Sequence, residues 1–108
     1  MWELVVSARI SISNGSIYLA ATDYDKYFQG IETVIVLIDG GYLQILPVKQ
    51  MASGGYLLKI RNAQGDRVIT SPDVFQNDGR LDWSSGDIIG NWSSDRGALV
   101  CELPELQT

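Results

Sequence analysis

The amino-acid sequence matches itself when it is shifted by 50 positions, and this internal match constrains the fold more than any other feature. The matched segments are residues 9–10 with 59–60, 14–15 with 64–65, and 19–24 with 69–74. After a longer connection in the second copy, residues 34–35 match 88–89 and residues 41–43 match 97–99. We interpret the match as a duplication of one structural unit. Two hairpins of one domain can also look alike by chance, so that alternative stays open.

The matched positions carry residues with defined backbone roles. Asn14 and Gly15 are typical of a two-residue hairpin turn, since both tolerate a positive φ. In the second copy Gly65, after Gln64, can serve the same purpose. The matched turns therefore predict one hairpin near the start of each copy.

Each copy also carries the start signal of a short helix. Thr22 and Ser71 can cap free N–H groups with a hydroxyl, and an aspartate follows in the first turn. Pro72 suits the first helical position. We expect helical turns at residues 22–28 and 71–75.

The remaining pattern is that of short strands separated by turns, which is typical of a barrel or sandwich. Residues 33–39 are almost all apolar and predict a buried strand. Residues 77–86 predict a polar loop before a strand at 87–93. The predicted fold is all-β with two short helical turns, a small barrel of two pseudo-symmetric strand–hairpin–helical turn–hairpin units. We expect one domain over residues 1–108, with repeats at 3–48 and 56–104, a linker at 49–55 and a tail at 105–108.

Composition narrows the location and the partners. The chain has 108 residues, 8 basic and 13 acidic, for a net charge of −5, which disfavours nucleic acid and anionic membranes as partners. No apolar stretch has the length of a membrane helix, and the sequence does not begin with a secretory signal. We therefore expect a soluble cytoplasmic protein.

The stretch Gly65-Asp66-Arg67-Val68-Ile69-Thr70-Ser71-Pro72 resembles the Gly-Arg-x-x-x-Pro stretch of AbrB-type and MraZ-type proteins, with one residue inserted. Residues 15–20 are its counterpart in the first copy. The resemblance implies a swapped-hairpin, or cradle-loop, β-barrel over most of the chain. It also implies DNA binding, for which the candidate contacts are Lys59, Arg61 and Arg67.

The first copy departs from the family pattern. It has Ser16 and Ile17 where a basic residue is expected, and Thr22 in place of the proline. The family fold can therefore hold while DNA binding fails, because a fold does not determine a function.

Few residues can carry chemistry. The chain has no histidine, which removes the commonest general base and metal ligand. Its one cysteine, Cys101, is typical of a small core residue in the last strand. An enzyme here would have to depend on carboxylates, as some hydrolases do, and the residues to test are Asp23, Asp25, Asp73 and Asp82. We expect no cofactor and no metal site.

The three tryptophans complete the candidates. Trp2 and Trp92 lie in predicted strands and suit the core or the barrel rim. Trp83 lies in a polar loop, where it either plugs one end of the barrel or meets a partner. The first functional hypothesis is thus a non-enzymatic binding or accessory protein that contacts a protein, or a second copy of itself. Its candidate partner-binding residues are Arg80, Asp82 and Trp83.

Overall fold

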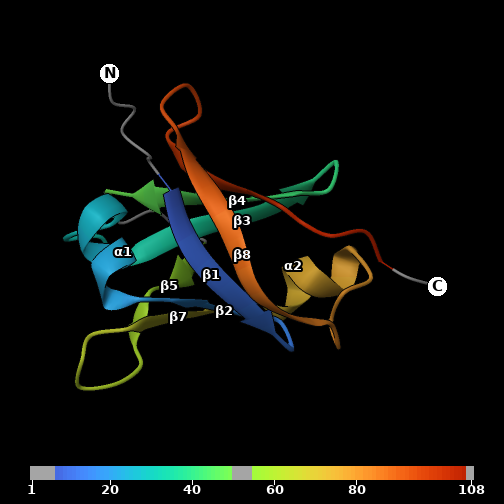
Figure 1. Ribbon diagram of the computed structural model, residues 1–108, viewed down its shortest axis with the longest axis horizontal. Helices are drawn as coiled ribbons and strands as arrows, with labels where there is room; N and C mark the ends of the chain where they lie inside the picture. Colours follow the sequence, from blue (N-terminus) through green and yellow to red (C-terminus); the bar gives the residue numbers. More distant parts are fainter. Residues whose placement is uncertain (1–6, 50–54, 107–108) are drawn as a thin grey trace.

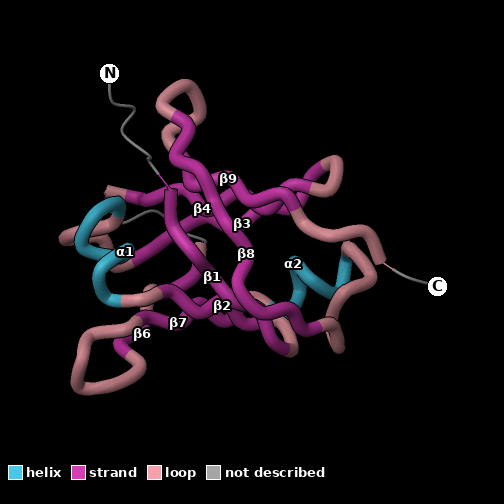
Figure 2. The backbone as a smooth tube through the Cα atoms, in the orientation of Figure 1, coloured by secondary structure: helices cyan, strands magenta, loops and turns pink. Residues whose placement is uncertain are grey.

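The computed structural model describes residues 7–49 and 55–106, and strands surround its core (Figures 1 and 2). The strands are β1 (Ser7–Ser13), β2 (Ser16–Leu19), β3 (Thr33–Asp39), β4 (Tyr42–Val48), β5 (Tyr56–Leu57), β6 (Lys59–Ile60), β7 (Arg67–Thr70), β8 (Ser84–Ser93) and β9 (Ala98–Glu102). The helices are α1 (Ala21–Tyr27) and α2 (Pro72–Asn77). In this described part of the chain, neither helix has the length and apolar character needed to cross a membrane. Trp2, the start of the first predicted strand and most of the predicted linker lie outside the described residues.

The sheet nearly closes on itself through one short segment. Its nine strands are antiparallel neighbours in the order β5-β3-β4-β9-β8-β1-β2-β7-β6. The two edge strands, β5 and β6, are separated only by the buried Leu58. Because β5 pairs with β3 and β6 pairs with β7, residues 56–60 bridge both edges. The predicted all-β barrel with two short helices is confirmed.

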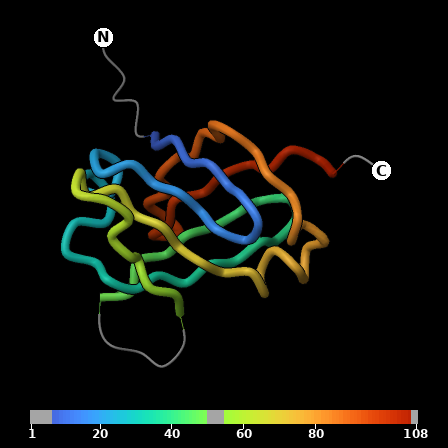
Figure 3. Tube along the Cα trace, turned by 90° about the horizontal axis from the view of Figure 1, so that it is seen from below, coloured from blue at the N-terminus to red at the C-terminus, as the bar shows by residue number. Residues whose placement is uncertain are grey.

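The strand pairing has the symmetry of two docked hairpin units. Each strand of the first half has a counterpart in the second: β1 corresponds to β5–β6, β2 to β7, β3 to β8 and β4 to β9. When every strand is replaced by its counterpart, the same set of strand pairs results. The pairs β2–β7 and β4–β9 map onto themselves, and β2 runs beside β7 in Figure 3. Val36 pairs with Ile45, and Gly90 pairs with Cys101, as the sequence match requires. That the halves share an origin stays a prediction.

The match of residues 9–10 with 59–60 is wrong by two positions. Ile12 pairs with Ile17 in the first hairpin, and Ile60 pairs with Arg67 in the second, so Ile12 is the counterpart of Ile60. The second turn is longer than the expected Gln64-Gly65 turn: the Arg61 N–H donates to the Asp66 carbonyl and closes a loop over residues 62–65. These two extra residues displace the first strand of the second copy.

The predicted hydroxyl caps from Thr22 and Ser71 are also wrong: Thr22 lies inside α1, whose N-cap residue is Ala20, and Ser71 at the N-cap of α2 makes no side-chain cap. Each helix start instead bonds the hairpin turn of the other half. The Ala21 N–H donates to Asp66 Oδ1 at 2.8 Å. The Ser71 N–H donates to the Gly15 carbonyl at 2.9 Å. The expected proline near the start of α2 is confirmed.

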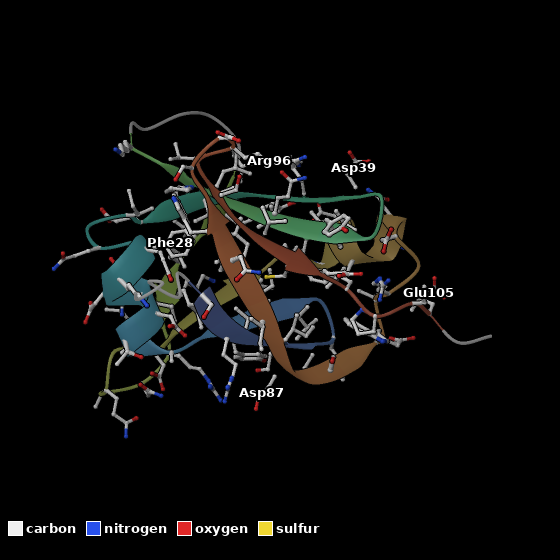
Figure 4. All side chains as sticks on the ribbon, turned by 45° about the horizontal axis from the view of Figure 1, so that its top comes forward. Phe28, Asp39, Asp87, Arg96 and Glu105 are labelled. Carbon is white, nitrogen blue, oxygen red and sulfur yellow. The ribbon has the colours of Figure 1, made fainter. Side chains whose placement is uncertain are left out.

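The two helices close the barrel ends, and their aromatic residues complete the core. Phe28, which ends α1 and is labelled in Figure 4, and Phe75 of α2 are fully buried. The two helices lie on opposite sides of the molecule (Figure 1). Trp92 stacks on Tyr27 with ring centroids 5.7 Å apart and meets the Phe28 ring edge-on. Trp92 therefore takes the core or rim position that the sequence suggests.

Strand β8 begins earlier than expected, because it includes three residues that were assigned to the polar loop 77–86. Ser84 pairs with Ser13, and Ser85 pairs with Ile12, before a bulge shifts the register between Ile12 and Ile10. The sequence hides this extension, since Ser84, Ser85 and Gly86 offer no apolar alternation.

Candidate functional site

The predicted partner site around Trp83 is mostly turned inward. Arg80 is only 5% exposed, and its Nε donates to Asp78 Oδ2 at 2.6 Å. The Arg80 guanidinium lies 4.7 Å from the centroid of the Trp83 ring. Trp83 is half-buried against the core, as a plug would be, and Asp82 is exposed. Of the three residues, only Asp82 is fully available to a partner.

The three predicted DNA contacts do not share one face. Lys59 pairs with Val68, and Arg67 pairs with Ile60, so the strand alternation sends Lys59 and Arg67 to opposite sides. Arg67 is half-buried, with its guanidinium 3.8 Å from the Tyr24 ring centroid and its Nη1 bonded to the Gly65 carbonyl. Lys59 and Arg61 are exposed. The basic trio is therefore split, and DNA binding stays a prediction.

The carboxylates proposed for hydrolysis are distributed over separate elements. Asp23 and Asp25 belong to α1, and Asp73 belongs to α2 on the other side of the barrel (Figure 1). Asp23 accepts a hydrogen bond from the Arg9 N–H, and Asp73 accepts one from the Tyr56 hydroxyl at 2.7 Å. The Asp73 hydrogen bond raises the pKa of Tyr56. Asp82 lies in the loop before β8.

Cys101 lies inside the barrel, where burial raises its pKa to about 12. Such a thiol stays protonated near neutral pH and is a poor nucleophile. Across residues 7–49 and 55–106, no three Cys, Asp or Glu side chains gather into a group that could hold a metal ion.

The outer surface of β5, β3 and β4 carries a group of exposed apolar side chains, which we name the apolar face. Its members are Leu57 (57% exposed), Leu37 (47%), Tyr42 (44%), Ile35 (41%) and the half-buried Leu46. The strand register places them together. Ile35 pairs with Leu46, and Leu57 pairs with Thr33, which lies on the same face of β3 as Ile35. The apolar face lies on three adjacent strands, and its outward row on β4 also holds Gln44, which pairs with Leu37 and is only 8% exposed.

The expectation that residues 33–39 form a fully buried strand is therefore wrong. Val34 and Val36 point into the core, whereas Ile35 and Leu37 point outward. An antiparallel strand with one wet face usually alternates apolar and polar residues. The unbroken apolar run was the sequence signal for this surface, because it shows that the outer positions are not selected for contact with water.

A second surface feature crosses β8, β1 and β2 on the outside of the barrel. A shallow, open trough of about 500 Å³ is lined mainly by polar residues and has Arg61 and Tyr18 on its wall. The lining serines are Ser11, Ser13, Ser84 and Ser85. A neighbouring recess of about 250 Å³ shares Ser11, Tyr18 and Arg61 with it, and its charged lining residues are Arg9, Asp23, Asp66 and Asp87. We name the first space the serine trough and the second the charged recess.

The serine trough could not be found from the sequence, because its wall is assembled from both halves. The Arg61 guanidinium lies 4.7 Å from the centroid of the Tyr18 ring, and the two residues are 43 positions apart. Arg9 was missed because it stands alone in the sequence, far from the basic trio.

No protein-family model matches the chain, and neither does any curated protein or solved structure. The resemblance to AbrB-type and MraZ-type proteins thus stays a prediction from residues 65–72.

Proposed function

We propose that this protein is a non-enzymatic binding protein, cytoplasmic in location, that uses its apolar face to dock a partner protein. The observation that carries the proposal is the set of large apolar side chains exposed on β5, β3 and β4. Water contact at such a patch is unfavourable by about 25 cal/mol per Å² of apolar area, and contiguous patches of this kind mark interaction surfaces.

The charges around the apolar face indicate the chemistry of the partner. Glu32 precedes β3, and Asp39 is its last residue. Glu102 of β9 pairs with Tyr42 of β4. All three carboxylates are exposed, and Asp39 stands at the tip of the β3–β4 hairpin in Figure 4. Two exposed bases accompany these carboxylates: Lys49 follows β4, and Arg96 lines one recess together with Tyr42 and Glu102. The complementary surface is therefore an apolar patch with a mainly basic rim.

A photocrosslinking amino acid at position 37 tests the proposal in cells that express the protein. We expect one partner protein to be captured from this position. The matched control places the same crosslinker at Arg9, an exposed outward position of β1, which β4, β9 and β8 separate from β3 in the sheet. Equal capture from both positions would contradict the proposal. Capture of a second copy of the chain would show that the apolar face forms a homodimer and does not bind a different protein.

A further inference from the structure

Arg61 stands on the wall shared by the serine trough and the charged recess, with its guanidinium against the Tyr18 ring. Within residues 7–49 and 55–106, the only ion pair joins Arg80 to Asp78, so neither Arg61 nor Arg9 forms one, although the charge of Arg61 acts on the nearby Asp66. Both arginines therefore keep hydrogen-bond donors for a ligand, and guanidinium groups match the oxygens of phosphate.

The loop that carries Arg61 is fixed by hydrogen bonds. Asn62 Oδ1 accepts from the N–H groups of Gln64 and Asp66, and Asn62 Nδ2 donates to Asp66 Oδ2 at 2.9 Å. The Asp66 carboxylate also bonds the first residue of α1. A ligand that meets Arg61 therefore has little loop entropy to overcome.

Hydroxyl groups complete the wall of the serine trough. Ser84 Oγ donates to Ser13 Oγ at 3.2 Å, which leaves the Ser13 hydroxyl hydrogen free to donate into the trough. Ser11 lies on the same outward row of β1, between Arg9 and Ser13. No carboxylate lines the serine trough.

The carboxylates of the charged recess are not equivalent. Asp23 and Asp66 already accept backbone N–H groups, whereas Asp87 makes no hydrogen bond within the described part of the chain. Asp87 is exposed at the edge of the recess, near the end of β8 opposite to Arg96 in Figure 4. Its negative charge opposes any anion that binds beside Arg61.

We infer that the serine trough binds the phosphate group of a small molecule, with Arg61 and the hydroxyl groups of Ser11 and Ser13 as donors. Tyr18 holds the Arg61 guanidinium in place, and Arg9 adds a positive charge from the recess. This site lies on β8, β1 and β2 and is independent of the apolar face.

Titrations followed by backbone-amide NMR test the inference, with inorganic phosphate and phenyl phosphate as probes. We expect saturable shifts at Ser11, Ser13 and Tyr18 with either probe, and tighter binding of phenyl phosphate if the ligand is an organic monoester. Arg61→Gln should weaken binding about tenfold, the loss of one charge-assisted hydrogen bond. Asp87→Asn should tighten binding about threefold by removing the opposing charge.

Arg96→Gln is the matched control, since it changes the net charge by the same amount as Arg61→Gln but lies beyond the far end of β8. It should alter the affinity for either phosphate probe less than about twofold. Circular dichroism checks that each variant is folded, and Ser13→Ala gives a second variant that removes one donor only. Unshifted trough resonances, or equal losses in Arg61→Gln and Arg96→Gln, would overturn the inference. Binding of single-stranded DNA without binding of either small phosphate would also overturn it.

Discussion

The hairpins β3–β4 and β8–β9 occupy equivalent places in the barrel, yet their outer surfaces differ. Both have the same register, with Val36 opposite Ile45 and Gly90 opposite Cys101. The first outward position is isoleucine on both strands, Ile35 on β3 and Ile89 on β8, whereas the second is Leu37 on β3 and Asn91 on β8. Because the barrel depends on inward residues and on strand pairing, the outer positions are free to diverge. Functional surfaces are therefore expected where equivalent outer positions differ.

The largest expected effect concerns the turns of the first-copy hairpins. Gly15 has φ +82°, and a Cβ there would lie 2.8 Å from Pro72 Cα, so Gly15→Ala should destabilise the fold by about 3 kcal/mol. Gly40, in the β3–β4 turn, has φ +60° and open space around it. Gly40→Ala should cost only about 1 kcal/mol. Urea unfolding measures both, and equal losses would show that the turn does not pack on α2.

The next largest effect concerns an inward position at which the hairpins β3–β4 and β8–β9 differ. Val36 fills its inward position, but a Cβ at Gly90 would lie 2.6 Å from the Cys101 sulfur. Gly90→Ala should therefore destabilise the protein by about 2 kcal/mol through overpacking. Gly86→Ala on the same strand has no heavy atom within 4 Å of its Cβ and serves as the control. Cys101→Ala should restore part of the loss at Gly90, and a failure to do so would remove this contact as the cause.

The backbone conformation was predictable from the sequence where the φ preference of a single residue determines it. The Asn14-Gly15 turn has the expected positive φ angles, 49° and 82°, and Pro72 stands where it was expected near the start of α2. The sequence could not predict that Asp66 bonds the start of α1 or that Arg61 meets Tyr18, because both contacts form only when the halves dock. It also could not separate the inward from the outward residues of β3, since all of them are apolar.

A smaller, pH-dependent effect distinguishes the two helix starts. Hydrogen bonds from Asn62 and Ala21, with the nearby charge of Arg61, lower the pKa of Asp66 below its ordinary value of 3.8. The ionised carboxylate therefore stabilises the fold above that pH, and the contribution is lost as the pH falls through the lowered pKa. Asp66→Asn should reduce Tm at neutral pH, and the difference from the unmodified protein should shrink in acid.

Asp25→Asn is the control for this comparison, because Asp25 is exposed on α1 and its carboxylate makes no hydrogen bond in the described part of the chain. A Tm difference for Asp66→Asn that is independent of pH would mean that the charge of Asp66 does not contribute.

The smallest expected effect on stability is at the apolar face itself. Leu37→Asn gives β3 the residue found at the equivalent position of β8, and Leu37 is 47% exposed. We expect the free energy of unfolding to change by less than about 0.5 kcal/mol, as for other surface substitutions. A loss several times larger would mean that Leu37 supports the barrel and is not reserved for a partner.

The central claim is that the apolar face binds a partner protein. The most direct test is to measure, by isothermal titration calorimetry, the affinity of the captured partner for variants of surface residues. Leu37→Asn should weaken binding about tenfold, the loss expected from about 1.4 kcal/mol of apolar burial, while Arg9→Gln on the distant strand β1 should leave the affinity unchanged. An unchanged affinity of the Leu37→Asn protein would contradict the assignment of the apolar face as the binding surface.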